Sequence, residues 1–178
     1  MRLEIEENFY LRTFSSDDKE SLFDLIDSNR KQLGVYLAWP PKTKTSEDTL
    51  WFINETIKEA KNHQYTFGIF VDEILVGVCS YNFMNIQNKK TEIGYWLGEN
   101  FQGHGHMTKT VKALVDYGFN HLKLNRIAIH CATTNKASSA VAKRLGFKLE
   151  GIARQNEVVN GNIYDHEIYS LLSSEVNS

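Results

Sequence analysis

The sequence predicts an α/β fold in which a single mixed sheet carries helices on its faces. The chain has 178 residues, the length of one typical domain. Hydrophobic residues make up 42% and charged residues 24%, which is typical of a globular protein with a packed core. Segments with strand-like and helix-like periodicity follow one another in the order β-α-α-β-β-β-α-β-α-β-β. We therefore expect one domain over residues 1–178.

The first part of the chain predicts a strand and two helices. Residues 10–14 alternate as a strand does, and residues 15–20 carry the caps and acidic residues of a helix start. Two adjacent prolines at 40–41 mark a loop. A second helix is expected from about Ser46. Its predicted buried face consists of Leu50, Ile53, Ile57 and Ala60.

A hairpin and a third strand follow. Residues 65–71 and 74–83 read as strands on either side of Asp72-Glu73, a two-residue turn. Residues 90–99 are rich in strand-forming side chains. A long helix then carries a regular apolar stripe, which consists of Met107, Val111, Leu114, Val115, Gly118, Phe119 and Leu122.

The last part of the chain predicts a strand, a short helix and two closing strands. Residues 126–131 read as the strand that completes a central β-α-β unit with residues 90–99. Residues 137–145 read as a helix that Gly146 ends. The closing strands are expected at 147–154 and 163–172.

Composition and charge exclude several classes of protein. The net charge of −2 lacks the basic footprint of a nucleic-acid binder. The longest apolar run, at 74–79, is too short to span a bilayer, and the N-terminus lacks the pattern of a signal peptide. Cys79 and Cys131 read as small core residues rather than a disulfide framework. We expect a soluble cytoplasmic protein that binds neither nucleic acid nor membrane.

The most informative segment joins the third strand to the long helix, and it reads Gln102, Gly103, His104, Gly105, His106, Met107, Thr108. Glycines let the backbone approach a ligand, and a helix start offers unpaired N–H donors that suit a phosphate. The segment is not a dinucleotide-binding fingerprint, because Thr108 stands where the third glycine would be. On these residues alone, a plain turn before an exposed helix start is the alternative.

Five ordered motifs carry a resemblance to a known family. Gln102-x-x-Gly105-x-Met107 resembles the acetyl-CoA motif of the GCN5-related N-acetyltransferases (GNAT), although Met107 replaces the usual Gly or Ala. Four further segments resemble its RimJ/RimL-type branch, which acetylates protein N-termini. These are Glu92-Ile93-Gly94-Tyr95-Trp96-Leu97, Asn125-Arg126-Ile127, Asn135-Lys136-Ala137-Ser138-Ser139, and Arg144-Leu145-Gly146-Phe147 with Glu150-Gly151.

The resemblance implies a fold and a cosubstrate. The fold is a mostly antiparallel sheet in which two parallel strands splay apart, and the cosubstrate is acetyl-CoA, with no metal. The pantetheine arm would pair with backbone at Trp96 and Leu97. The pyrophosphate would bind amides between Gln102 and Thr108. Asn135 and Ser138 would contact the arm near its thioester end.

Acetyl transfer to an amine requires a base. At pH 7, freeing an α-amine of its proton costs about 1–1.4 kcal/mol, and a lysine about 4.6 kcal/mol, so a modest base suffices for an N-terminus. Glu92, on the strand before the loop, is the leading candidate, with an exposed strand carboxylate as the alternative. Glu157 is the rival. The sequence places it in a loop between the closing strands, where it is either the base or a solvated charge.

The departing thiolate also requires a proton donor. Many family members use a tyrosine seven residues after the matching Asn, but Ala142 occupies that position here. Ser138 is the hydroxyl nearest Asn135 and is the candidate acid. Its alternative role is a hydrogen bond at the helix start. His104 and His106 invite a metal, but no further ligand stands beside them at the required spacing.

The resemblance implies a protein N-terminus as the acceptor, with a ribosomal protein as the first choice. Two alternatives stay open: a small amine such as a polyamine, antibiotic or amino acid, and a non-catalytic module that binds acetyl-CoA. Trp39, with Tyr36 and Leu37, is expected either to wall the acceptor site or to plug the fold. The resemblance also makes a homodimer an expectation.

Overall fold

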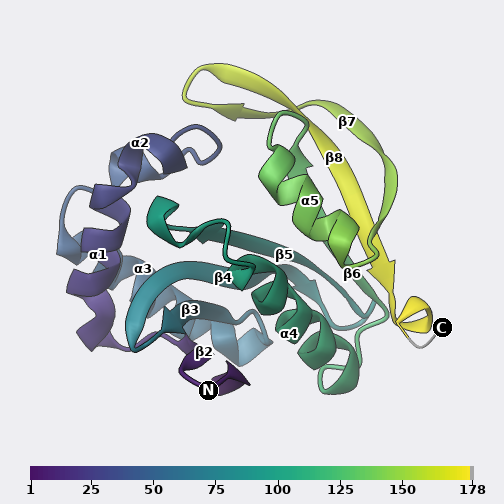
Figure 1. Cartoon of the computed structure of the whole chain (residues 1–178), viewed down its shortest axis with the longest axis horizontal. Helices are drawn as coiled ribbons and strands as arrows, with labels where there is room; N and C mark the ends of the chain where they lie inside the picture. Colours follow the sequence, from purple (N-terminus) through teal and green to yellow (C-terminus); the bar gives the residue numbers. More distant parts are fainter. Residues whose placement is uncertain (177–178) are drawn as a thin grey trace.

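The computed structural model describes residues 1–176 as one eight-stranded sheet with helices on both faces (Figure 1). The strands lie in the order β1-β2-β3-β4-β5-β6-β8-β7. Every neighbouring pair is antiparallel except β5 and β6, which confirms the mixed α/β fold class. The strands are β1 Arg2–Glu6, β2 Phe9–Thr13, β3 Thr66–Val71, β4 Ile74–Asn85, β5 Lys90–Leu97, β6 Arg126–Ala132, β7 Lys148–Val159 and β8 Asn162–Leu172.

Two groups of helices cover the two faces of the sheet. On one face, α1 (Lys19–Ser28), α2 (Arg30–Leu33) and α3 (Ser46–Glu59) form the group that packs over the first strands. On the other face, α4 (His106–Asn120) packs against β1 and β5, and α5 (Lys136–Arg144) packs against β6. Each face has its own apolar core. The first core includes Tyr10, Leu22, Ile53 and Phe70, and the second includes Phe67, Ile93, Leu114 and Ile127.

The predicted elements are all present, and the structure adds the strand β1 and the short separate helix α2. The turn at Asp72-Glu73 has φ of +49° and +62°, the conformation that matches the twist of a tight hairpin. The added strand, β1, is a short edge strand paired antiparallel with β2. In β1, partly buried Leu3 and Ile5 alternate with exposed charged residues. Two apolar residues are too few for the alternating pattern to predict a strand.

The buried face of α3 differs from the prediction. Thr49, Ile53 and Thr56 face the core, whereas Ile57 is 46% exposed. The reason lies in the contact with α1, because the Thr49 hydroxyl donates a 2.8 Å hydrogen bond to the carbonyl oxygen of Lys19. Because its hydroxyl is hydrogen-bonded, a threonine can be buried at a helix position where the hydrophobic pattern predicts only apolar residues.

The parallel pair β5–β6 separates partway along its length. The two strands are paired only from Lys90–Arg126 to Glu92–Ala128. Beyond Glu92, β5 continues to Leu97 without a partner on that side, and α4 and α5 begin near the gap. This opening positions the candidate site. Within residues 1–176, no helix combines the length and apolar character needed to cross a membrane.

Candidate active site

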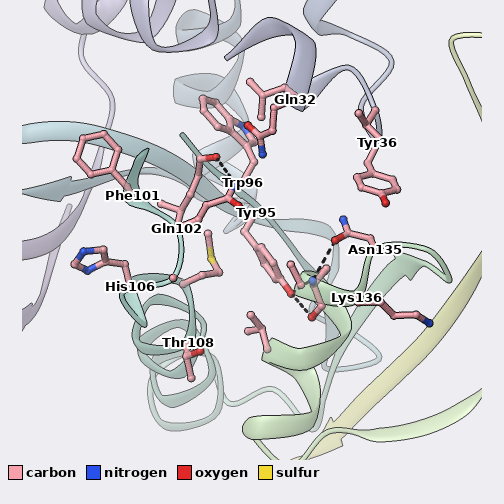
Figure 2. Close-up of a pocket in the computed structure, with 18 of the residues that line it drawn as sticks. Gln32, Tyr36, Tyr95, Trp96, Phe101, Gln102, His106, Thr108, Asn135 and Lys136 are labelled. Carbon is pink, nitrogen blue, oxygen red and sulfur yellow. Dashed lines mark hydrogen bonds between the residues drawn. The ribbon is translucent and has the colours of Figure 1, made fainter. Parts of the chain in front are cut away.

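A cavity of about 780 Å³ lies between the unpaired end of β5 and the start of α5 (Figure 2). Four segments far apart in the sequence line it: the α2 end and the turn after it, β5, the loop into α4, and α5. The predicted cosubstrate residues that line it are Trp96, Leu97, Gln102, Gly103, Gly105, His106, Met107, Thr108, Asn135 and Ser138. His104, Glu92 and Glu157 do not line it.

The loop before α4 presents its backbone to this cavity. Gly103 and Gly105 both have φ of +81°, which is in the left-handed region that glycine adopts without strain. A Cβ at either position would meet nothing within 4 Å, so the glycines are required by conformation and not by crowding. Gly105 is the N-cap of α4, and no side chain caps the helix. The first-turn amides therefore stay available to an anion.

His106 lies in that first turn, and its ring meets the edge of Phe9 with a centroid distance of 5.2 Å. Its buried Nδ1 atom has no hydrogen-bond partner. Burial lowers the pKa of His106, with a smaller effect from His104, so the ring is neutral at pH 7.

Ser138 and Tyr95 meet at the start of α5. The Tyr95 hydroxyl lies 3.0 Å from Ser138 Oγ and 3.2 Å from the Ser138 carbonyl oxygen, and Figure 2 shows the Tyr95 ring pointing at this helix start. The helix cap itself is made by Asn135, whose Oδ1 accepts from the Ser138 amide at 3.2 Å. The Ser138 hydroxyl is therefore not used as the cap. Burial raises the pKa of Tyr95 to about 12, which keeps the phenol protonated.

Two cations on α5, Lys136 and Arg144, also line the cavity, and the sequence analysis named them only as members of motifs, without a role at the site. Arg144 Nη1 donates a 2.6 Å hydrogen bond to Thr108 Oγ1, which ties α5 to the first turn of α4. Positive charge next to uncapped helix amides strengthens an anion site. Only the packing of α5 against α4 brings these groups together.

Glu92 is the last residue of β5 that pairs with β6, at the point where the strands separate. Its Oε2 lies 3.5 Å from His130 Nδ1, and both side chains are about 30% exposed. Both residues face away from α4 and α5. Nearby, hydrogen bonds from Arg126 and Ser170 hold the pKa of Glu150 at about 2.

Glu157 lies within β7, so its expected position in a loop is wrong. It pairs with Tyr164 of β8, and its Oε2 lies 3.2 Å from His166 Nε2. Between Ala153 and Glu157 the register shifts, and the Gln155 amide donates a 2.7 Å hydrogen bond to Asp165 Oδ1. This bulge sets the direction of Glu157.

Both carboxylate–imidazole pairs share one face of the sheet. His130 pairs with Ile168 of β8, two residues from His166, and residues two apart on a strand point to the same side. The two base candidates, Glu92 and Glu157, are therefore both on the face opposite α4 and α5. Each has a histidine beside it, which the sequence analysis did not find because the partners are separated by 38 and 9 residues.

The tip of the β7–β8 hairpin docks on the segment after α2. The Asn160 side-chain amide donates to the Gly34 carbonyl oxygen at 2.8 Å, and the Tyr164 hydroxyl donates to the Val35 carbonyl oxygen at 3.0 Å. Tyr36, which lines the cavity, packs on Tyr164 with ring centroids 5.7 Å apart. Trp39 packs on Trp96 and does not line the cavity.

Among residues 1–176, no group of three or more His, Cys, Asp and Glu side chains is arranged to hold a metal ion. The rings of His104 and His106 lie 5.8 Å apart. Cys79 and Cys131 are buried and unpaired, as the sequence predicts.

Comparison with known proteins identifies the family. The model of the acetyltransferase (GNAT) domain matches residues 8–148. The ribosomal-protein-serine acetyltransferase of Escherichia coli K12 is 32% identical over 169 residues, which cover 94% of each chain. Among solved structures, RimL, a ribosomal L7/L12 α-N-protein acetyltransferase in complex with coenzyme A, superposes with a TM-score of 0.92 at 31% identity, over 97% of this chain and 98% of its own. The microcin C7 self-immunity acetyltransferase MccE, in complex with acetyl-CoA and AMP, gives 0.91 at 33% identity, over 96% and 95%. The chain therefore belongs to the GNAT family and is an N-acetyltransferase.

Proposed function

We propose that this chain transfers the acetyl group of acetyl-CoA directly to the N-terminal α-amine of a protein, with a ribosomal protein as the first candidate. One observation carries the proposal. A single cavity runs from the uncapped amides of α4 to the Ser138 hydroxyl, and the opposite face of the sheet offers Glu92 and Glu157. Names of the relatives, a ribosomal-protein-serine acetyltransferase and RimL, support the choice of acceptor.

The residues present fit acetyl-CoA. Amides at the start of α4, with Arg144 and Lys136 beside them, suit the phosphates, and charge-assisted hydrogen bonds contribute about 1.5–3 kcal/mol each. Beyond Glu92, the backbone of β5 lacks a strand partner on the β6 side. Trp96 and Leu97 lie on this stretch, so an amide-bearing arm can pair with it as a strand would.

Different residues of this chain then accept the proton of the amine and stabilise the leaving sulfur. Bound acetyl-CoA supplies an activated acyl group. Glu157 or Glu92 accepts the proton that the acceptor ammonium must lose, and the Ser138 hydroxyl donates a hydrogen bond to the sulfur as it leaves. An α-amine needs only about 1–1.4 kcal/mol to lose its proton at pH 7, so partly exposed carboxylates are adequate bases.

A second candidate function is acetylation of a small amine. The observation that favours it is the similarity to MccE, whose structure was solved with acetyl-CoA and AMP. The β7–β8 hairpin is hydrogen-bonded to Gly34 and Val35, next to the cavity-lining Tyr36, and an acceptor site enclosed by this contact would also suit a small molecule.

A thiol-release assay separates the candidates. The panel contains a peptide with a free N-terminal serine, the same peptide with a blocked N-terminus and an internal lysine, a polyamine, an amino acid and an aminoacyl nucleotide. We expect turnover with the free serine peptide and none with the blocked peptide. Turnover confined to a small amine would favour the second candidate. Acetyl-CoA binding without turnover on any amine would contradict both.

We further propose that residues 1–178 work as a single domain, as a homodimer in the cytoplasm. The family match over 8–148 and the 94% coverage of the Escherichia coli relative support one domain. The names of the ribosomal relatives support the compartment. Light scattering on the purified protein tests the dimer, and a monomer mass would contradict it.

A further inference from the structure

Tyr95 and Ser138 form a hydrogen-bonded pair that spans the gap between β5 and α5. Tyr95 comes from the unpaired part of β5, and Ser138 is in the first turn of α5. Both residues line the cavity. Their hydroxyl oxygens are 3.0 Å apart, and the Tyr95 oxygen is also 3.2 Å from the Ser138 carbonyl oxygen. The pair therefore offers three oxygens and two hydroxyl hydrogens.

The number of hydrogens permits two arrangements. A carbonyl oxygen only accepts, whereas each hydroxyl has one hydrogen to donate. When Tyr95 donates to the Ser138 carbonyl, Ser138 is left to donate its own hydrogen to the Tyr95 oxygen. When Tyr95 donates to Ser138 Oγ, the Ser138 hydrogen is free to point into the cavity. The two arrangements differ by rotation of two hydrogens, and no heavy atom moves.

We propose that Tyr95 is a positioning residue that turns the hydroxyl hydrogen of Ser138 toward the sulfur of the leaving coenzyme A. This inference rests on the proposed function, in which Ser138 faces that sulfur. As the carbon–sulfur bond breaks, its electron pair stays on sulfur. Negative charge there favours the arrangement in which Tyr95 donates to Ser138 and Ser138 donates to sulfur. A donor aimed at developing charge is stronger when it needs no reorganisation.

The protons balance without a charged tyrosine. The nitrogen that forms the amide gives up one N–H proton, and the thiolate gains one to become the free thiol. Tyr95 stays neutral throughout, in keeping with the burial that raises its pKa to about 12. Its role is to donate a hydrogen bond to Ser138, whose hydroxyl in turn donates a hydrogen bond to the thiolate. The thiolate then takes its proton from solvent, so Ser138 and Tyr95 both keep theirs.

Cys131 is the other neighbour of the Ser138 hydroxyl. Burial raises the pKa of the Cys131 thiol, and a hydrogen bond with Ser138 partly opposes that rise. The thiol is a weak hydrogen-bond partner. A stronger bond from Tyr95 therefore decides which way the Ser138 hydrogen points.

The test compares Tyr95→Phe with Ser138→Ala. Tyr95→Phe keeps the ring and removes only the hydroxyl. We expect each variant to lower kcat by about 100-fold, the lower end of the range for loss of one donor to a developing anion, with KM for acetyl-CoA unchanged. The double variant should be no slower than Ser138→Ala, because both changes disable one chain of hydrogen bonds. Ser138→Thr keeps a hydroxyl and should retain most of the rate.

A second readout does not depend on turnover. Ultraviolet absorbance of the thiolate reports the titration of coenzyme A bound to the enzyme. In Tyr95→Phe, the pKa of the bound thiol should rise by about 1 relative to the wild type, because one donor to the thiolate is misdirected. Tyr169→Phe is the matched control. Tyr169 is buried, its hydroxyl donates to Glu167 Oε2 at 3.0 Å, and it does not line the cavity.

Each outcome separates the two levels of the proposal. Wild-type kcat in Ser138→Ala would remove Ser138 from the proposed function. A slow Ser138→Ala together with wild-type kcat and thiol titration in Tyr95→Phe would overturn only the inference about Tyr95. If Tyr95→Phe unfolds at a lower temperature than Tyr169→Phe, the thiol is titrated at a temperature at which both variants are folded. A thiol pKa that is unshifted in Tyr95→Phe under those conditions also overturns the inference.

Discussion

Glu157 Oε2 lies 3.2 Å from His166 Nε2, on the same side of β8 as the Tyr164 that contacts the segment after α2. The bulge of β7 makes this arrangement, since three residues there oppose a single partner on β8. In the proposed function, this carboxylate takes a proton from the incoming amine, and the bulge fixes its direction.

We therefore expect Glu157→Gln to lower kcat/KM by about 100-fold and to flatten the rise of the rate with pH, because Gln cannot accept the proton. Glu92→Gln is the matched comparison, since it removes the rival carboxylate beside His130. The measurement is the pH–rate profile of each variant on the same peptide acceptor. Full activity in both variants would remove both carboxylates from the mechanism.

The loop before α4 gives a prediction on binding. Gly105→Val should weaken acetyl-CoA binding at least about 10-fold by calorimetry, because a branched side chain at φ of +81° is strained and fills the anion site. Gly146→Val is the control. Gly146 has φ of +78°, a Cβ there also meets nothing within 4 Å, and it does not line the cavity. An equal loss of affinity in Gly105→Val and Gly146→Val would mean that backbone strain alone causes the loss, and it would contradict a role of Gly105 in binding.

Arg144 gives a prediction on charge. Arg144→Met should weaken coenzyme A binding by about 10-fold or more, since a charge-assisted hydrogen bond contributes about 1.5–3 kcal/mol. The dependence of affinity on salt should also become shallower. Lys112→Met removes a charge from α4 outside the cavity, where Lys112 pairs with Asp116, and should leave affinity unchanged. Unaltered affinity in Arg144→Met would place the phosphates elsewhere.

The Arg12–Asp18 pair gives a prediction on stability. Burial acts to raise the pKa of Asp18, but hydrogen bonds from Arg12 and Ser15 outweigh it and leave that pKa below its usual value. A carboxyl group whose pKa is lower in the folded state than in the unfolded state stabilises the folded protein. This contribution is fully present at pH values above the unfolded pKa, near 3.9, and it is lost as the pH falls through the folded pKa.

Asp18→Asn should therefore lower the free energy of unfolding by about 2 kcal/mol at pH 7, a value reduced because Arg12 is partly exposed. The difference from the wild type should shrink on acidification below about pH 4. Urea unfolding at several pH values measures this. A difference that stays constant down to pH 2 would show that the charge on Asp18 is not its source.

Sequence reasoning predicted the parts of the fold that local pattern controls. The stripe from Met107 to Phe119 lies on α4, whereas Leu122 falls after the end of the helix at Asn120. The glycines at 103 and 105, predicted to let the backbone approach a ligand, lie in the left-handed region. It did not find Tyr95 beside Ser138, because 43 residues separate them and only the splay of β5 from β6 brings them together.

Glu157 shows why the sequence pattern did not predict the full length of β7. Periodicity ends the strand before Glu157, yet the Asp165 side chain holds the bulge and β7 resumes after it. That hydrogen bond is a tertiary contact that no pattern in the segment records. The predicted cosubstrate residues of the loop and of β5 line the cavity, apart from His104, whereas the predicted base Glu92 of β5 does not.

The hydrogen bond from Asn160 to Gly34 joins the β7–β8 hairpin to the segment after α2, two parts of the chain that are 126 residues apart in sequence. The hairpin turn that carries Asn160 does not line the cavity, whereas Val35, Tyr36 and Leu37 of the segment after α2 do. If the proposed function holds, changing the length of the hairpin turn would alter which amine is accepted and leave the affinity for acetyl-CoA nearly unchanged. A change in the segment after α2 would alter both.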